Sequence, residues 1–175
     1  MQKMSGFTIV EIVVICAVIA ILATVIGVGW SGTVASGRDR AHATEQKEWI
    51  GRYETFRQRF SVYPSAADEA NTTALAGRYC LGSGFAGNQC AGGSILTPAT
   101  STDNNKLLRD LAKVGTLPEY QHTAVNGYTG PWADYTNATR IRIYHSYIKS
   151  TCPDGTTKDT TITGANLCYI QLEKN

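Results

Sequence analysis

The sequence predicts an α+β protein in which one long N-terminal helix packs on a small antiparallel sheet. Three observations support this fold class. Residues 7–30 form an apolar run with a single charge, and residues 38–60 carry apolar side chains at helical spacing. The last third of the chain contains two short segments, residues 140–149 and 167–172, with the alternating pattern typical of antiparallel strands.

The apolar run, residues 7–30, predicts a transmembrane helix. It reads FTIVEIVVICAVIAILATVIGVGW. A helix of this length extends roughly 36 Å at about 1.5 Å per residue, which is more than the ~30 Å hydrocarbon layer of a bilayer. Its one charged residue, Glu11, needs a partner, because a carboxylate near the bilayer centre costs roughly 2.5–3.5 kcal/mol on insertion scales.

A partner for Glu11 is available if the chain is cut after Gly6. The cut creates an α-amino group on Phe7, four residues from Glu11 and on the same helical face. Residues 1–6, MQKMSG, suit such a cut because they are short, include the basic Lys3 and end in a small residue. They differ from an ordinary secretory signal, since the apolar run follows the cut and stays in the mature protein.

The segment KMSG followed by FTIVEIVV resembles the class III signal of type IV pilins and pseudopilins. In that family a short basic leader and a glycine precede a phenylalanine, with a glutamate four residues later. The resemblance covers residues 1–30. It implies that a prepilin peptidase cuts after Gly6 and methylates Phe7, and that Glu11 is the assembly carboxylate. A plain single-pass anchor with a chance glutamate is the alternative.

Five cysteines predict two disulfides. Cys16 lies in the apolar run and the other four lie beyond it, an even number that is typical of disulfides in an oxidising compartment. Four cysteines allow three connectivities. We favour the local pairs, Cys80–Cys90 and Cys152–Cys168, because each closes a loop rich in glycine, threonine and asparagine. Free thiols are the alternative, and the cysteine and histidine spacings match no zinc site.

Residues 31–64 continue the helix as an amphipathic element. Aromatic side chains recur along it every three or four residues: Trp49, Tyr53, Phe56 and Phe60. This spacing predicts one apolar face, which we interpret as a core contact with the sheet rather than a binding surface. We expect Pro64 to end the helix. With the apolar run, the pattern predicts a single helix over residues 7–60.

Four glycines lie where the apolar run meets the amphipathic element: Gly27, Gly29, Gly32 and Gly37. Each costs about 1 kcal/mol of helix stability relative to alanine, so the helix can loosen at this junction. Close packing of helices through small residues is an equally good interpretation.

Residues 65–175 form the predicted globular head. The segment 61–103 has no clear pattern apart from a glycine-rich loop around the first cysteine pair. Residues 103–114 predict a short helix with an aspartate at its start. Residues 119–139 are loop-like, and a third short strand is expected near residues 160–163.

No catalytic constellation is found, so we expect a protein that is not an enzyme and needs no cofactor. His42, His122 and His145 lie in unrelated contexts; we expect His42 on an exposed part of the helix and His145 at the edge of the core. Asp154 and Asp159 match no calcium-loop spacing, so no metal site is expected. The net charge of +2 is too balanced for nucleic acid or anionic lipid as the main partner.

The resemblance implies a structural subunit that polymerises into a type IV pilus filament and serves adhesion, twitching motility or DNA uptake. Its partners would be copies of itself, the prepilin peptidase, the pilus assembly platform and, before assembly, the bacterial cell membrane. The filament would lie outside the cell. A pseudopilin of a type II secretion system is one alternative. A membrane-anchored extracellular binding domain that does not polymerise is another. The expected division is residues 1–6, 7–30, 31–64 and 65–175, as leader, assembly helix, amphipathic helix and head.

Overall fold

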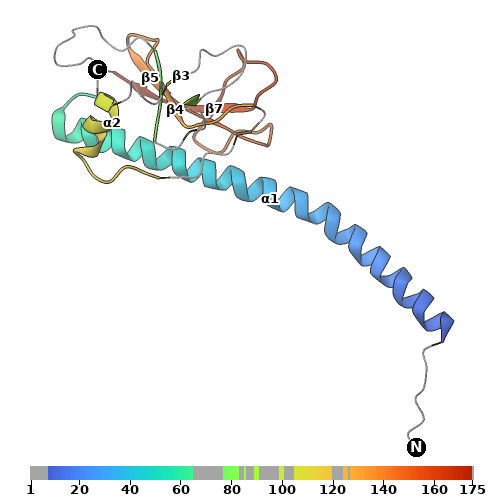
Figure 1. Ribbon diagram of the computed structural model, residues 1–175. Helices are drawn as coiled ribbons and strands as arrows, with labels where there is room; N and C mark the ends of the chain where they lie inside the picture. The colour runs from blue at the N-terminus through green and yellow to red at the C-terminus, as the bar shows by residue number, and fades with distance from the viewer. Residues whose placement is uncertain are drawn as a thin grey trace, which may run out of the picture. The chain divides into compact units, whose positions relative to one another are not determined.

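The computed structural model describes residues 8–64, 77–82, 85, 89–90, 99–100, 105–119, 124–125 and 127–174. The chain divides into two compact units, Met1–Gly37 and Arg38–Asn175, and we call the second the head unit. Helix α1 (Ile9–Phe60) runs through both units, from blue to green in Figure 1. The head unit adds helix α2 (Asn105–Ala112) and two antiparallel sheets. This is an α+β arrangement with an N-terminal helix, as the sequence predicts.

Helix α1 confirms the predicted long helix. It contains 52 residues and begins two residues after the predicted start. It ends at Phe60, before Pro64, because a φ of 59° at Ser61 takes the backbone out of the helix. The Ser61 amide still donates to the Arg57 carbonyl at 2.7 Å, which satisfies one of the last carbonyls of the helix.

The N-terminal part of α1 does not confirm the predicted transmembrane helix, and it leaves the role of the glycine-rich junction open. We expected residues 7–30 to cross a membrane, but no helix in the described part of the chain is long and apolar enough to do so. The backbone is helical through the glycine-rich junction. A Cβ atom added to Gly32 or Gly37 would meet no atom within 4 Å, so neither glycine is needed for close packing within this chain.

The main sheet has five antiparallel strands in the order β1-β4-β5-β7-β6. Their bounds are β1 Arg78–Cys80, β4 Trp132–Asp134, β5 Arg140–Ser146, β7 Leu167–Glu173 and β6 Thr157–Lys158. A second, two-stranded sheet pairs β2 (Gln89–Cys90) with β3 (Ala99–Thr100). The two long predicted strands are confirmed as β5 and β7, which pair over seven residues from Arg140↔Glu173 to Ser146↔Leu167.

Two assignments in the head unit are wrong. The third strand is β6, at Thr157–Lys158, and not residues 160–163. Those residues form a turn because the Asp159 carboxylate accepts from the amide and the hydroxyl of Thr161, at 2.8 and 2.6 Å. The loop-like segment 119–139 contains strand β4, which is only three residues long and is ordered by pairing with β1 and β5.

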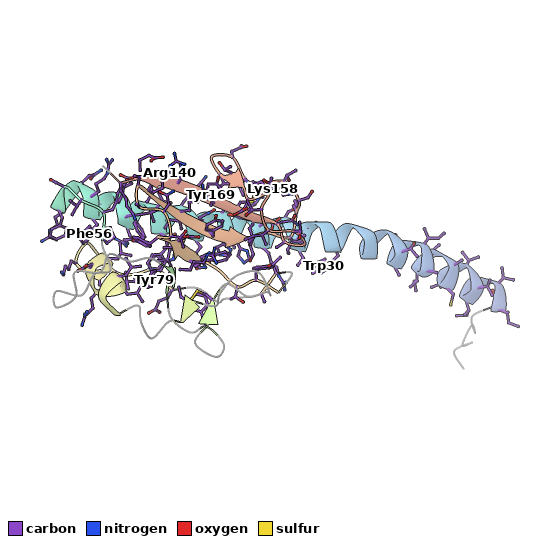
Figure 2. The ribbon with its side chains drawn as sticks, turned by 90° about the horizontal axis from the view of Figure 1, so that it is seen from above. Trp30, Phe56, Tyr79, Arg140, Lys158 and Tyr169 are labelled. Carbon is purple, nitrogen blue, oxygen red and sulfur yellow. A yellow bond between two sulfur atoms is a disulfide. The ribbon has the colours of Figure 1, made fainter. Side chains whose placement is uncertain are left out.

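The core of the head unit lies on both faces of the main sheet. On one face Trp49, Tyr53 and Phe56 of α1 are buried against the sheet, which confirms the core interpretation of the aromatic stripe. The stripe ends earlier than predicted, because Phe60 is 41% exposed. Figure 2 labels Phe56 of α1 and Tyr79 of β1, which belongs to the same cluster. The opposite face carries a second buried cluster, with Cys80, Phe85, Trp132, Tyr144 and Leu167 among its members.

Both predicted disulfides are present. Cys80 joins Cys90, ten residues apart, and Cys152 joins Cys168, sixteen residues apart. The first links β1 to β2, and the second links a loop to β7. Cys16 is a free, exposed cysteine.

Candidate functional site

The start of α1 is closed by reciprocal hydrogen bonds between Thr8 and Glu11. The Glu11 amide donates to Thr8 Oγ1 at 3.3 Å. Glu11 Oε2 accepts from the Thr8 amide at 2.8 Å and from the Thr8 hydroxyl at 2.7 Å. This is the capping box that a Thr-x-x-Glu sequence favours. The sequence of residues 8–11, TIVE, carried this signal, which the interpretation of Glu11 as an assembly residue overlooked.

Of the three residues of the predicted cleavage and pairing site, the structure describes only Glu11. Gly6 and Phe7 lie outside the described residues, so cleavage, methylation and pairing of the Phe7 amine with Glu11 stay predictions. The capping box uses only Oε2 of Glu11. Within the described residues no hydrogen bond to Glu11 Oε1 is found.

Ten large aliphatic side chains on the N-terminal part of α1 are exposed, and we call them the apolar helix surface. They are Ile9, Val10, Ile12, Val13, Val14, Ile15, Val18, Ile19, Ile21 and Leu22. At 3.6 residues per turn these positions point in every direction around the helix axis. A helix that is apolar all round is typically a buried one, so this surface requires a covering partner.

A second group of polar side chains is buried where α1 meets β5, and we call it the helix–sheet polar cluster. Its members are Asp39, His42, Glu45 and Gln46 of α1, together with His145, Ser146 and Tyr147 at the end of β5. The α1 members continue the aromatic stripe toward the N-terminus at helical spacing. This continuation is the sequence signal for their burial. His42 was expected to be exposed, and that expectation is wrong, because the side chain is 7% exposed.

Asp39 and Gln46 form hydrogen bonds with backbone groups of β5, β7 and the residues that follow β5. The two carboxylate oxygens of Asp39 accept from the amides of Ile148 and Lys149, at 2.7 and 3.0 Å. Gln46 Nε2 donates to the carbonyls of Ile143 and Cys168, at 2.6 and 3.1 Å. Gln46 Oε1 accepts from the Tyr147 hydroxyl at 2.8 Å. Both amide hydrogens of Gln46 are therefore used, and the side chain is matched to one position along β5 and β7.

The two histidines of the cluster stack on one another. Their ring centroids are 4.1 Å apart and the rings are 23° from parallel. His42 Nδ1 lies 2.8 Å from the Ser146 carbonyl, so this nitrogen carries the proton. His145 Nδ1 accepts from the Ser146 amide at 2.9 Å, which places the proton of His145 on Nε2, 3.1 Å from Glu45 Oε2. The hydrogen-bond partners thus place a proton on Nδ1 of His42 and on Nε2 of His145.

The surroundings of His42 lower its pKa below the usual value. Burial is the largest cause, and the neighbouring His145 acts in the same direction. The Ser146 carbonyl, Glu45 and Asp39 oppose this shift and are outweighed. A buried imidazole without full solvation disfavours the charged form. The cluster is therefore built for neutral His42.

Comparison with known proteins gives no match for this chain. No family model matches it, and no curated protein and no solved structure does either.

The remaining candidate residues do not form a site together. No group of three or more His, Cys, Asp or Glu side chains within the described ranges could hold a metal ion. The Asp159 carboxylate accepts from the Tyr144 hydroxyl at 2.8 Å and from Thr161, so its acceptor sites serve the fold. His122 lies outside the described residues.

Proposed function

We propose that this chain is a structural subunit that assembles with copies of itself into a type IV pilus filament. The apolar helix surface is the observation that carries the proposal. It covers every side of α1 between residues 9 and 22 and is exposed in the single chain. Several copies packed in a helical bundle would cover all sides at once.

The energies favour assembly through this surface. Full burial of a valine, leucine or isoleucine side chain contributes about 1.5–3 kcal/mol, so ten of them contribute on the order of 15–30 kcal/mol as an upper bound. Burial of one carboxylate without a partner costs several kcal/mol. Apolar burial therefore exceeds the cost of burying Glu11, and a cationic partner would remove that cost.

In this proposal Glu11 sets the register between copies. Oε2 stays in its own capping box, and Oε1 accepts from the Phe7 amine of a neighbouring copy that has been cut after Gly6. A copy that slips along the bundle leaves a charge without a partner at apolar depth, so the aligned arrangement is favoured. The proposal includes a bacterial cell membrane as the location before assembly and the cell exterior as the location of the filament.

Two substitutions separate the charge of Glu11 from its capping role. Glu11→Gln keeps a side chain that can close a capping box but removes the charge, whereas Glu11→Ala removes both. We expect both variants to be made at normal levels and to yield at least about tenfold less sheared filament. Glu48→Ala is the matched control, since Glu48 is an exposed glutamate of α1 outside the apolar run.

Filament yield and the intact mass of the sheared protein are the measurements. A mass that begins at methylated Phe7 is expected in filaments. Loss of filaments in Glu11→Ala but not in Glu11→Gln would show that the cap matters and the charge does not, which contradicts the pairing. A chain found only in membranes with residues 1–6 intact would favour an anchored binding domain instead.

A further inference from the structure

The face of the main sheet opposite α1 carries a row of polar side chains. Arg78 of β1 pairs across the strands with Asp134 of β4, Asp134 pairs with Arg142 of β5, and Arg142 pairs with Gln171 of β7. Directly paired residues on one face lie within side-chain reach of each other. One carboxylate thus stands between two guanidinium groups on adjacent strands.

A pocket of about 340 Å³ opens over this row. Its lining includes the aromatic pair Trp132 and Tyr144, whose rings stack 3° from parallel at 5.3 Å. Asp159, Thr161 and Ile162, from the turn before β7, form another part of the wall. All of these residues belong to the head unit, and the exposed wall is mostly polar.

The two carboxylates of the pocket have most of their acceptor sites filled. Asp134 Oδ1 accepts from the amide and hydroxyl of Thr136, at 2.9 and 2.6 Å, and its Oδ2 accepts from Arg78. Asp159 repeats the arrangement with Thr161 and the Tyr144 hydroxyl. Each carboxylate has about four acceptor sites, and three are used. Both aspartates are also at least 92% buried, so a ligand meets other groups first.

The donors of the pocket are in surplus. Arg78 uses Nε for Asp134, at 3.0 Å. Arg142 is half-buried, and its direct side-chain contacts are with neutral groups: Nε lies 3.3 Å from Gln171 Oε1, and the guanidinium lies 4.7 Å from the Tyr169 ring centre. The guanidinium also interacts with the Tyr144 hydroxyl, and the Asp159 carboxylate acts on it electrostatically from a greater distance. Among the described residues no carboxylate oxygen lies within 4.0 Å of the Arg142 nitrogens. The buried indole N–H of Trp132 likewise has no acceptor within the described ranges.

We propose that this pocket binds a small molecule through an oxyanion group, with Arg142 as the principal contact and Arg78 beside it. A guanidinium presents paired N–H donors that match a carboxylate or a phosphate. Asp134 holds Arg78 in place, and the Tyr169 ring supports Arg142. The two buried aspartates limit the negative charge that the pocket accepts, which favours a small ligand with one anionic group over a polyanion.

The experiment is a titration of the full chain in detergent micelles, followed by NMR of the arginine side-chain Nε–H groups. Acetate, inorganic phosphate and glucose are the three probes. Saturable binding of acetate or phosphate at millimolar concentration is expected, with a shift of the Arg142 signal. Comparing the affinities for acetate and phosphate shows whether the pocket prefers a planar or a tetrahedral oxyanion. Binding of glucose alone, or no saturation by either anion below about 20 mM, would overturn the proposal.

Arg142→Gln should weaken anion binding at least about tenfold. Arg140→Gln is the matched control, because Arg140 lies on the same strand, is paired with Glu173 and does not line the pocket. Figure 2 labels Arg140 of β5 and Tyr169 of β7. Equal loss in both variants would show an unspecific effect of charge and overturn the site. If Arg142→Gln does not fold, Arg142→Lys keeps the charge without the paired donors, and unchanged affinity in that variant overturns the proposed contact.

Discussion

At the scale of single residues, His42 couples the stability of the head unit to pH. Its pKa is lowered in the folded chain, chiefly by burial, while the unfolded chain has a histidine pKa near 6.5. Below about pH 6.5 the unfolded chain therefore binds a proton that the folded chain does not. The contribution of neutral His42 to the free energy of unfolding is complete above this pH and decreases as the pH falls below it. The groups that face His42 are Asp39, Glu45, His145 and Tyr147.

We predict that the free energy of unfolding decreases between pH 6.5 and pH 5, by up to about 1.4 kcal/mol per pH unit for one proton. His42→Asn retains a donor near the position of Nδ1 but cannot take up a proton. This variant should be less stable at pH 7 and should lose most of the pH dependence in that window. Urea unfolding at a series of pH values provides the measurement. An identical slope in both proteins would assign the dependence to another group.

At the scale of elements, the aromatic stripe of α1 shows how far sequence periodicity reaches. Spacing predicted that Trp49, Tyr53, Phe56 and Phe60 share a face, and the first three are buried in the core. Periodicity could not show where the sheet ends beneath the helix. The sheet leaves Phe60 partly exposed, so Phe60 should contribute less to the free energy of unfolding than the buried Trp49 on the same helix face.

Trp49→Ala should therefore cost about 3–5 kcal/mol of stability, because it empties a fully buried site. Phe60→Ala should cost less than about 1 kcal/mol, since it removes a ring that is already 41% exposed. The two substitutions delete aromatic side chains from the same helix face, so each serves as the other's control. Chemical denaturation of both variants compares them, and similar losses would contradict the assigned end of the core.

The strands show why part of the fold escaped the sequence. Strands β5 and β7 are seven residues long and alternate clearly, so both were predicted. Strands β1 and β4 are three residues long, which is too short for a period of two to be recognised. Their order comes from pairing with neighbours far away in the chain. The pocket proposed to bind an oxyanion depends on that pairing, because the pairing brings Arg78 and Asp134 beside Arg142. No local sequence pattern contains this information.

At the scale of the whole molecule, the disulfides and the free cysteine belong to different units. Cys80–Cys90 and Cys152–Cys168 lie in the head unit, and Cys16 lies in the N-terminal unit. A bridge across a loop near 15 residues contributes about 3 kcal/mol in the chain-entropy model. The stability of the head unit should therefore depend on redox conditions through the two bridges and not through Cys16.

Replacing both Cys152 and Cys168 with serine should lower the free energy of unfolding of the full chain by about 3 kcal/mol. Cys16→Ser should change it by less than about 0.5 kcal/mol, because that side chain is exposed. Thermal and urea unfolding, followed by the near-ultraviolet signal of the buried tryptophans, measures both. A large loss in the Cys16 variant would contradict the division into units.

The helix–sheet polar cluster also affects how the head unit responds to a force along α1. Seven hydrogen bonds join side chains between Asp39 and Gln46 to the sheet side of the head unit, all within about two turns of α1. A pull along α1 acts on all of these bonds, because they join the same two turns of the helix to β5, β7 and the residues after β5. Sliding by one helical turn would separate every donor from its acceptor inside an apolar surrounding. The helix–sheet polar cluster should therefore resist extraction of α1 from the rest of the head unit when the helix is pulled along its axis.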